Sequence, residues 1–219
     1  MKRLPWCTLG FSVLALAVHF VPALGNVLQF GRAAVAHGQV WRFFTAHLTH
    51  FGADHLRWDL LAFVVLGSLA EGVSRTAFLT TLGAAAPVIT AGVWASQPQF
   101  ATYRGLSGID SALFGVVVAN LLVAGWRDRH RFSIGIGGLA LAGFAAKCAF
   151  ELATGGTVFV DTGGAFAPVP LAHLLGMLTG VAVIWRSQLV SARLSRADNW
   201  LVPIDCKEPS SFTSSTSAK

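Results

Sequence analysis

The stretch LAHLLGMLTG (residues 171–180) has a small residue at every fourth position, at Ala172, Gly176 and Gly180. Residues four apart lie on one face of a helix, and small residues on that face let another transmembrane helix approach closely. A similar series occurs earlier in the chain, at Gly108, Ala112, Gly115 and Ala119. We therefore expect these two segments to form helices that pack together.

The composition indicates that such helices cross a membrane. Of the 219 residues, 54% are hydrophobic and only 12% are charged, whereas soluble domains have about 25% charged residues. Apolar runs near the roughly 20 residues that a span needs occur at about 4–24, 54–72, 77–95, 108–125, 133–153 and 168–186. We predict an all-α integral membrane protein, with a six-transmembrane helical bundle in residues 1–186 and a polar, disordered tail in residues 187–219.

The basic residues lie at the ends of the apolar runs and predict the orientation of the bundle. Most Lys and Arg residues fall in the connectors of one side, so the positive-inside rule predicts that both termini are cytoplasmic. The formal charge of +6 forms no basic patch, and we expect no nucleic-acid partner. The first run is long for a signal peptide, so we interpret it as a retained helix; cleavage would leave five spans. The cysteines have no CxxC spacing, which predicts neither a disulfide framework nor a zinc site.

A candidate nucleophile lies where the fourth apolar run begins. In YRGLSGID (residues 103–110), Ser107 stands between Gly105 and Gly108. A serine hydroxyl becomes reactive when a base takes its proton and donors stabilise the oxyanion. His173 in the stretch 171–180 is the candidate base, because the packing of the two small-residue faces would bring it to a similar depth. The bundle interior could instead hold His173 by a hydrogen bond, and Ser107-x-x-Asp110 also fits a helix capping box.

Other ionisable residues fall within or beside the apolar runs. Such groups are costly in a bilayer and usually face the bundle interior or a water-filled cavity. They are His47, His50, His55, Asp59, Asp110, Lys147 and Glu151. Lys147 and Glu151 are four residues apart, so we expect them to neutralise each other. Asp110 could complete the cap, favour the helix N-terminus or meet Lys147.

Four motifs in order give the chain a resemblance to a known family. They are Trp41-Arg42, then His50-x4-His55-x3-Asp59, then Gly105-x-Ser107-Gly108, and finally Ala172-His173-x2-Gly176-x3-Gly180. Together they resemble the rhomboid family of intramembrane serine proteases. The resemblance implies a rhomboid-type bundle, a catalytic dyad of Ser107 and His173 without a required third acid, and no cofactor or metal. It also implies an oxyanion site made by the Ser107 backbone N–H with the side chains of His50 and Asp59, while His55 supports the second helix.

Rhomboids usually have asparagine at the position of Asp59. An ionised carboxylate aimed at an oxyanion would oppose the developing charge. Burial favours the neutral carboxyl, so Asp59 either is protonated and donates a hydrogen bond or pairs with His55. The resemblance implies single-pass membrane proteins as substrates, cut near the outer end of their helix. HLRWDLL (residues 55–61) and YRGLSG (residues 103–108) also resemble the rhombosortase subgroup, which implies a bacterial inner membrane and substrates with a Gly-Gly-type C-terminal sorting helix.

Two other functions remain open at the level of the sequence. A non-catalytic rhomboid-like protein would bind membrane proteins without cutting them, although such a protein would be free to lose Ser107 and His173. A membrane redox protein would use its histidines as haem or metal ligands. No HExxH motif is present, which disfavours a zinc protease. The sequence predicts a lipid bilayer and a transmembrane protein as partners and leaves the oligomeric state open.

Overall fold

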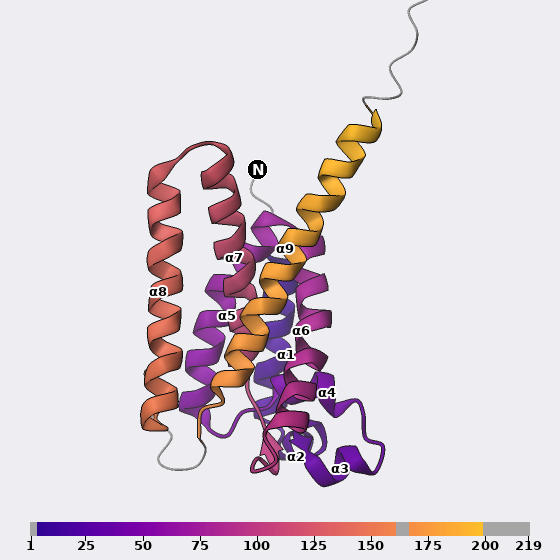
Figure 1. The fold of residues 1–219 in the computed structure, drawn as a ribbon. Coiled ribbons are helices and arrows are strands. Elements are labelled where there is room, and N and C mark those ends of the chain that lie inside the picture. Colours follow the sequence, from indigo (N-terminus) through magenta and orange to yellow (C-terminus); the bar gives the residue numbers. More distant parts are fainter. Residues whose placement is uncertain (1–3, 161–166, 199–219) are drawn as a thin grey trace, which may run out of the picture. The chain divides into compact units, whose positions relative to one another are not determined.

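Long helices joined by short loops make up most of the computed structural model, which describes residues 4–160 and 167–198 (Figure 1). The elements in chain order are α1 (Trp6–His19), α2 (Pro22–Leu28), β1 (Phe30–Gly31), α3 (Arg32–Ala36), α4 (Arg42–Thr45), the 3-10 helix η1 (Ala46–Leu48), α5 (Ala53–Val73), α6 (Arg75–Ser96), β2 (Thr102–Tyr103), α7 (Ser107–Arg127), α8 (Arg131–Thr154) and α9 (Pro170–Asp198).

Within residues 4–160 and 167–198, four helical segments are long and apolar enough to cross a membrane, namely α6, α7, α8 and Pro170–Val190 of α9. The first predicted span is instead a pair of helices, α1 and α2, bent by 108°. The bend falls just before Pro22, which suits the first position of a new helix but not a helix interior. If the bent pair is one span, the structure has five spans.

The remaining predicted span corresponds to α5, which has 21 residues. This helix is more polar than the four clear spans, because it contains four charged residues. They are Asp54, Arg57, Asp59 and Glu71. The multi-pass helical architecture is therefore supported, whereas six spans and cytoplasmic termini stay predictions.

The C-terminal helix α9 continues to Asp198, beyond the predicted end of the last span at residue 186. Residues 199–219 of the predicted tail lie outside the described residues. The chain divides into a unit of residues 1–187 and a unit of residues 188–219, and the contacts below belong to the first.

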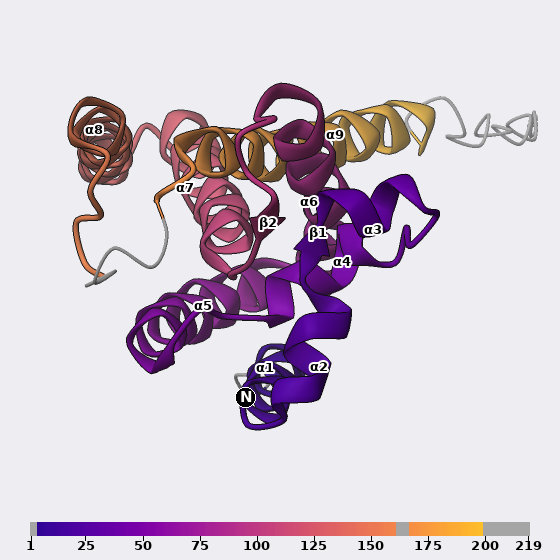
Figure 2. The same ribbon diagram turned by 90° about the horizontal axis from the view of Figure 1, so that it is seen from below.

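Helix α7 occupies the middle of this unit. It contacts α5, α6 and α8, and Figure 2 shows it between α5 and α9. A Cβ atom at Gly176 would lie 2.1 Å from the carbonyl oxygen of Gly108, and one at Gly180 would lie 1.9 Å from that of Ala112. The backbones of α7 and α9 are thus in direct contact, and the close packing expected from the small residues is confirmed.

The polar segment after α1 is fixed to the loop that precedes α7. Strands β1 and β2 pair in antiparallel fashion, with Phe30 opposite Tyr103. The buried Arg42 donates to the carbonyl oxygens of Asn26 at 2.9 Å and Gln29 at 2.5 Å. These contacts hold a stretch of short helices and turns, and they give Arg42 of the Trp41-Arg42 motif a structural role.

Helix α1 is held to α5 by a buried carboxylate. One oxygen of Glu71 accepts hydrogen bonds from the backbone N–H of Thr8 at 2.9 Å and from its hydroxyl at 3.0 Å. Arg75 contacts the other carboxylate oxygen at 3.0 Å. Glu71 thus has a clear structural role at the α1–α5 interface.

We predict that Gly180→Ala destabilises the protein more than Gly138→Ala does. The added methyl group at Gly180 would overlap the backbone of α7, so the helices must separate, which costs about 1–3 kcal/mol. Nothing lies within 4 Å of a Cβ atom at Gly138, a glycine in the interior of α8. Denaturation by SDS in mixed micelles measures the difference in free energy of unfolding. Equal stability of the two variants would contradict the close α7–α9 contact.

Candidate active site

A cavity of about 820 Å³ lies among α5, α7, α8 and α9. Its wall contains polar side chains from all four helices, including His55 and Asp59 of α5, Ser107 and Asp110 of α7, Lys147 and Glu151 of α8, and His173 of α9. Much of the remaining wall is apolar, with Trp58 and Phe144 among its residues. The cavity therefore combines reactive groups with a surface suited to a hydrophobic ligand.

Ser107 is the first residue of α7, and a glycine before it makes the tight approach to α5 possible. Gly105 has φ +116°, and a Cβ atom there would lie 2.7 Å from His55 Nε2 and 3.0 Å from Asp59 Oδ2. The N-cap of α7 is Leu106, and no side chain in the described part of the chain forms a capping hydrogen bond there. The capping-box interpretation of Ser107 is therefore wrong, and its hydroxyl is available for another partner.

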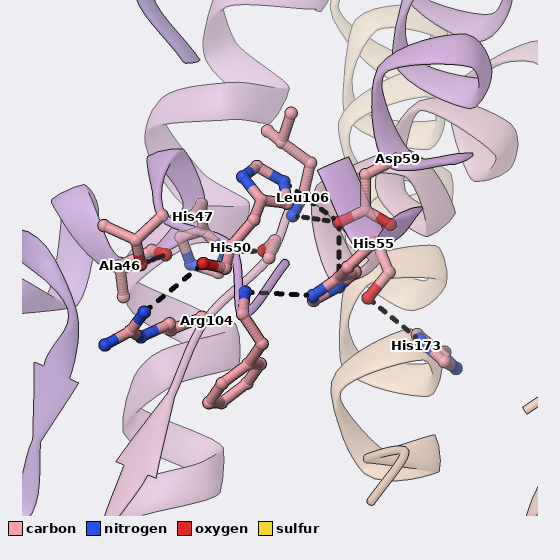
Figure 3. A network of polar contacts seen from close by, with 12 residues as sticks. Ala46, His47, His50, His55, Asp59, Arg104, Leu106 and His173 are labelled. Atoms are coloured by element: carbon pink, nitrogen blue, oxygen red, sulfur yellow. Dashed lines mark hydrogen bonds and ion pairs between the residues drawn. The ribbon is translucent and has the colours of Figure 1, made fainter. Parts of the chain in front are cut away.

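That partner is His173, a buried residue near the start of α9. Its Nε2 atom lies 3.2 Å from Ser107 Oγ. In Figure 3 a dashed line from the ring of His173 marks this contact. Gly176 lies one turn further along α9 and touches the backbone of α7. The contact between α7 and α9 thus places the imidazole of His173 beside the hydroxyl of Ser107. A serine nucleophile requires a base in this position.

The other imidazole nitrogen of His173 faces α8. Its Nδ1 atom lies 3.0 Å from Glu151 Oε2 and 3.2 Å from Lys147 Nζ. Lys147 Nζ also lies 2.6 Å from Glu151 Oε1, so the predicted neutralising pair is confirmed. Glu151 Oε2 is buried and has no aligned hydrogen bond among the described residues, even though Nδ1 is close. The sequence did not predict the contact with His173.

Asp59 is the acceptor around which the α5 side of the site is built (Figure 3). Its Oδ2 atom accepts a hydrogen bond from the backbone N–H of Leu106 at 2.7 Å. It also lies 3.2 Å from Nε2 of both His50 and His55. The carboxylate thus holds the turn that leads into Ser107, and it meets both histidines rather than His55 alone.

His50 and His55 occupy different surroundings. His55 lines the main cavity, whereas His50 lines a second cavity of about 260 Å³ with His19, Asn26 and Arg104. The structure thus brings His55, rather than His50, to the cavity of Ser107, which reverses the arrangement expected from the motif. Burial lowers the pKa of His50, although the hydrogen bond and the charge of Asp59 act in the opposite direction.

Contacts of His47 and Arg104 also hold the loop before Ser107. His47 is buried. Its Nδ1 atom lies 3.3 Å from the carbonyl oxygen of Gly105, and its Nε2 atom lies 3.0 Å from the carbonyl oxygen of Ala86. Arg104 donates to the carbonyl oxygen of His50 at 3.3 Å and lies over the ring of Phe51 at 5.1 Å. His47 and Arg104 therefore position the loop, and Arg104 also lines the cavity that contains Ser107.

Gly108 and Asp110 have separate structural settings on α7. A Cβ atom at Gly108 would lie 3.1 Å from Tyr103 Oη, and the Gly108 carbonyl touches α9. Asp110 is buried at the cavity, and its Oδ1 atom has no hydrogen-bond partner among the described residues. Gly108 thus belongs to the packing around the nucleophile, and Asp110 plays no capping role.

The geometry agrees with a comparison to known protein families. The family model of the rhomboid domain matches residues 37–188, a range that includes every motif named above. No curated protein matched the sequence. Members of the matching family are intramembrane serine proteases. On the extent of this match, the chain belongs to the rhomboid family.

Proposed function

We propose that this protein is an intramembrane serine endopeptidase with a dyad of Ser107 and His173. The observation that carries the proposal is the 3.2 Å contact between Ser107 Oγ and His173 Nε2 in a cavity walled by membrane helices. Family membership supports the same chemistry at a coarser level. No metal or cofactor takes part in the proposed reaction.

The reaction proceeds in two stages. Ser107 Oγ attacks the peptide carbonyl carbon while its proton passes to His173 Nε2. When the tetrahedral intermediate collapses, the C–N bond breaks and His173 gives that proton to the leaving amine. Water then attacks the acyl-enzyme ester with His173 again as the base, which frees the new carboxyl end and restores the Ser107 hydroxyl.

The oxyanion requires donors on the side of the cavity formed by α5 and the start of α7. Ser107 begins α7, so its backbone N–H has no partner four residues earlier in the helix. We assign this N–H and the imidazole of His55 to the oxyanion, because Ser107 and His55 both line the main cavity. For His55 to donate there, its Nε2–H turns from Asp59 Oδ2, which lies 3.2 Å away. Asp59 accepts the N–H of Leu106 and holds this wall in place; His50 supports it from the second cavity.

The substrates are single-pass membrane proteins, cut near the outer end of their helix. Apolar residues of α5 and α8 line the cavity of Ser107, among them Trp58, Leu61 and Phe144, and they suit a hydrophobic segment. A narrower proposal is that the substrates carry a Gly-Gly-type C-terminal sorting helix. The segments 55–61 and 103–108 support this narrower class, which corresponds to the rhombosortase subgroup in a bacterial inner membrane.

We predict that a fluorophosphonate probe labels the wild-type protein at Ser107. Ser107→Ala removes the nucleophile and His173→Ala removes its base, so both variants are expected to lose labelling by at least ~10²-fold. Ser111→Ala is the matched control, because Ser111 also lines the cavity but its hydroxyl donates to the Ser107 carbonyl at 2.8 Å. This control should be labelled like the wild type.

Gel fluorescence of detergent-purified protein, followed by mapping of the modified peptide, measures the labelling. Absence of labelling in the wild type, under conditions where a known rhomboid protease reacts, would contradict the protease proposal. It would favour a non-catalytic membrane-protein binding factor instead. Equal labelling of Ser107→Ala would also refute the assignment of the nucleophile.

We predict that Asp59→Asn keeps labelling and cleavage within about tenfold of the wild type. The amide oxygen can still accept the N–H of Leu106, and the amide group can donate a hydrogen bond where the carboxylate cannot. Asp59→Leu has no acceptor, and the buried N–H left without a partner costs about 1–3 kcal/mol. Cleavage rates and thermal unfolding of both variants check the prediction. Full inactivity of a folded Asp59→Asn protein would show that the acid itself is required.

A further inference from the structure

The imidazole of His173 is enclosed on both sides. Ser107 Oγ lies 3.2 Å from Nε2, and Glu151 Oε2 lies 3.0 Å from Nδ1. Both His173 and Glu151 are buried, with exposed fractions of 5% and 3%. A serine, a histidine and a carboxylate therefore follow one another in space, contributed by α7, α9 and α8.

The tautomer of His173 decides whether it can act as a base. To take the Ser107 proton, Nε2 must carry the lone pair, so the proton of the neutral ring must be on Nδ1. A buried N–H needs an acceptor, because leaving it without one costs about 1–3 kcal/mol. Glu151 Oε2 is the acceptor that the described residues place beside Nδ1.

Lys147 would favour the opposite tautomer if it donated to Nδ1 across the 3.2 Å contact. Nε2 would then carry the proton and could not accept one from Ser107. Lys147 has a nearer acceptor, however, because its Nζ atom lies 2.6 Å from Glu151 Oε1. The other carboxylate oxygen, Oε2, is buried without an aligned hydrogen bond. A small rotation would pair this oxygen with Nδ1–H and satisfy both groups.

We infer that Glu151 is a positioning residue that completes a Ser107–His173–Glu151 triad, with Lys147 holding the carboxylate. Glu151 accepts the Nδ1–H hydrogen bond, selects the tautomer in which Nε2 faces Ser107, and stabilises the imidazolium that forms when the serine proton moves. The proton stays on His173 and does not pass to Glu151. This inference rests on the proposed protease function and adds a third member to its dyad.

The test is the rate of fluorophosphonate labelling of Glu151→Gln, which needs no peptide substrate. We expect labelling to slow by as much as about 10⁴-fold, the effect of replacing the acid of a Ser-His-Asp triad by its amide. With a cleavable substrate, kcat should fall while KM changes little. In ¹⁵N NMR spectra of ring-labelled protein, His173 should carry its proton on Nδ1 in the wild type and lose this preference in Glu151→Gln.

Two further variants separate this role from a structural one. Glu71→Gln changes another buried carboxylate, at the α1–α5 interface, and should label at the wild-type rate whatever its stability. The double variant Lys147→Met/Glu151→Gln removes the partly exposed lysine charge that Glu151→Gln leaves unpaired, and it should still label slowly.

Each outcome has a distinct meaning. Labelling of a folded Glu151→Gln protein within about threefold of the wild type would overturn the triad, and so would wild-type labelling of the double variant. An NMR spectrum in which Nδ1 of His173 is unprotonated in the wild type would also overturn the triad, because Lys147 would then set the tautomer. A wild-type protein that is not labelled at all would instead contradict the proposed protease function.

Discussion

The contact between the backbones of α7 and α9 is the constraint on which the site depends. Lipid tails are as apolar as leucine side chains, so helices in a bilayer associate largely through close fit. Gly176 and Gly180 supply that fit by bringing α9 onto the carbonyls of Gly108 and Ala112. Ser107 and His173 lie at the ends of the two helices that this contact joins. Their separation is therefore set by main-chain atoms, which have no alternative rotamers.

A second set of constraints comes from buried polar groups. Asp59 brings together a backbone N–H from the loop before α7 and two imidazoles from the segment around α5. A buried acceptor of this kind stabilises the fold only while its donors stay in place. The loop before Ser107 is consequently held from α5 and η1, on the side away from His173. Close backbone packing thus fixes the His173 side of the site, and buried polar contacts fix the side formed by α5.

Helical periodicity and residue type were sufficient to predict part of this arrangement. The spacing of small residues predicted the α7–α9 contact, and the four-residue spacing of Lys147 and Glu151 predicted their ion pair. Spacing within one helix does not say which neighbouring helix a side chain faces, so the contact of Glu151 with His173 was not predicted. The placement of His50 at the oxyanion site was implied by the family resemblance, whereas the structure places His55 in the wall of the cavity of Ser107. The β1–β2 pair joins residues about 70 positions apart, and two-residue strands have no detectable pattern.

The order of the helices along the chain has a consequence for biosynthesis. Ser107 begins α7, but the imidazole beside it belongs to α9, the last of the described helices. Chains are made from the N-terminus, so the serine enters the membrane well before its partner histidine. During that interval the Ser107 hydroxyl lacks its contact with His173, so the proposed dyad is incomplete until α9 has been made. The order of synthesis thus makes the assembly of the proposed dyad one of the last steps in building the bundle.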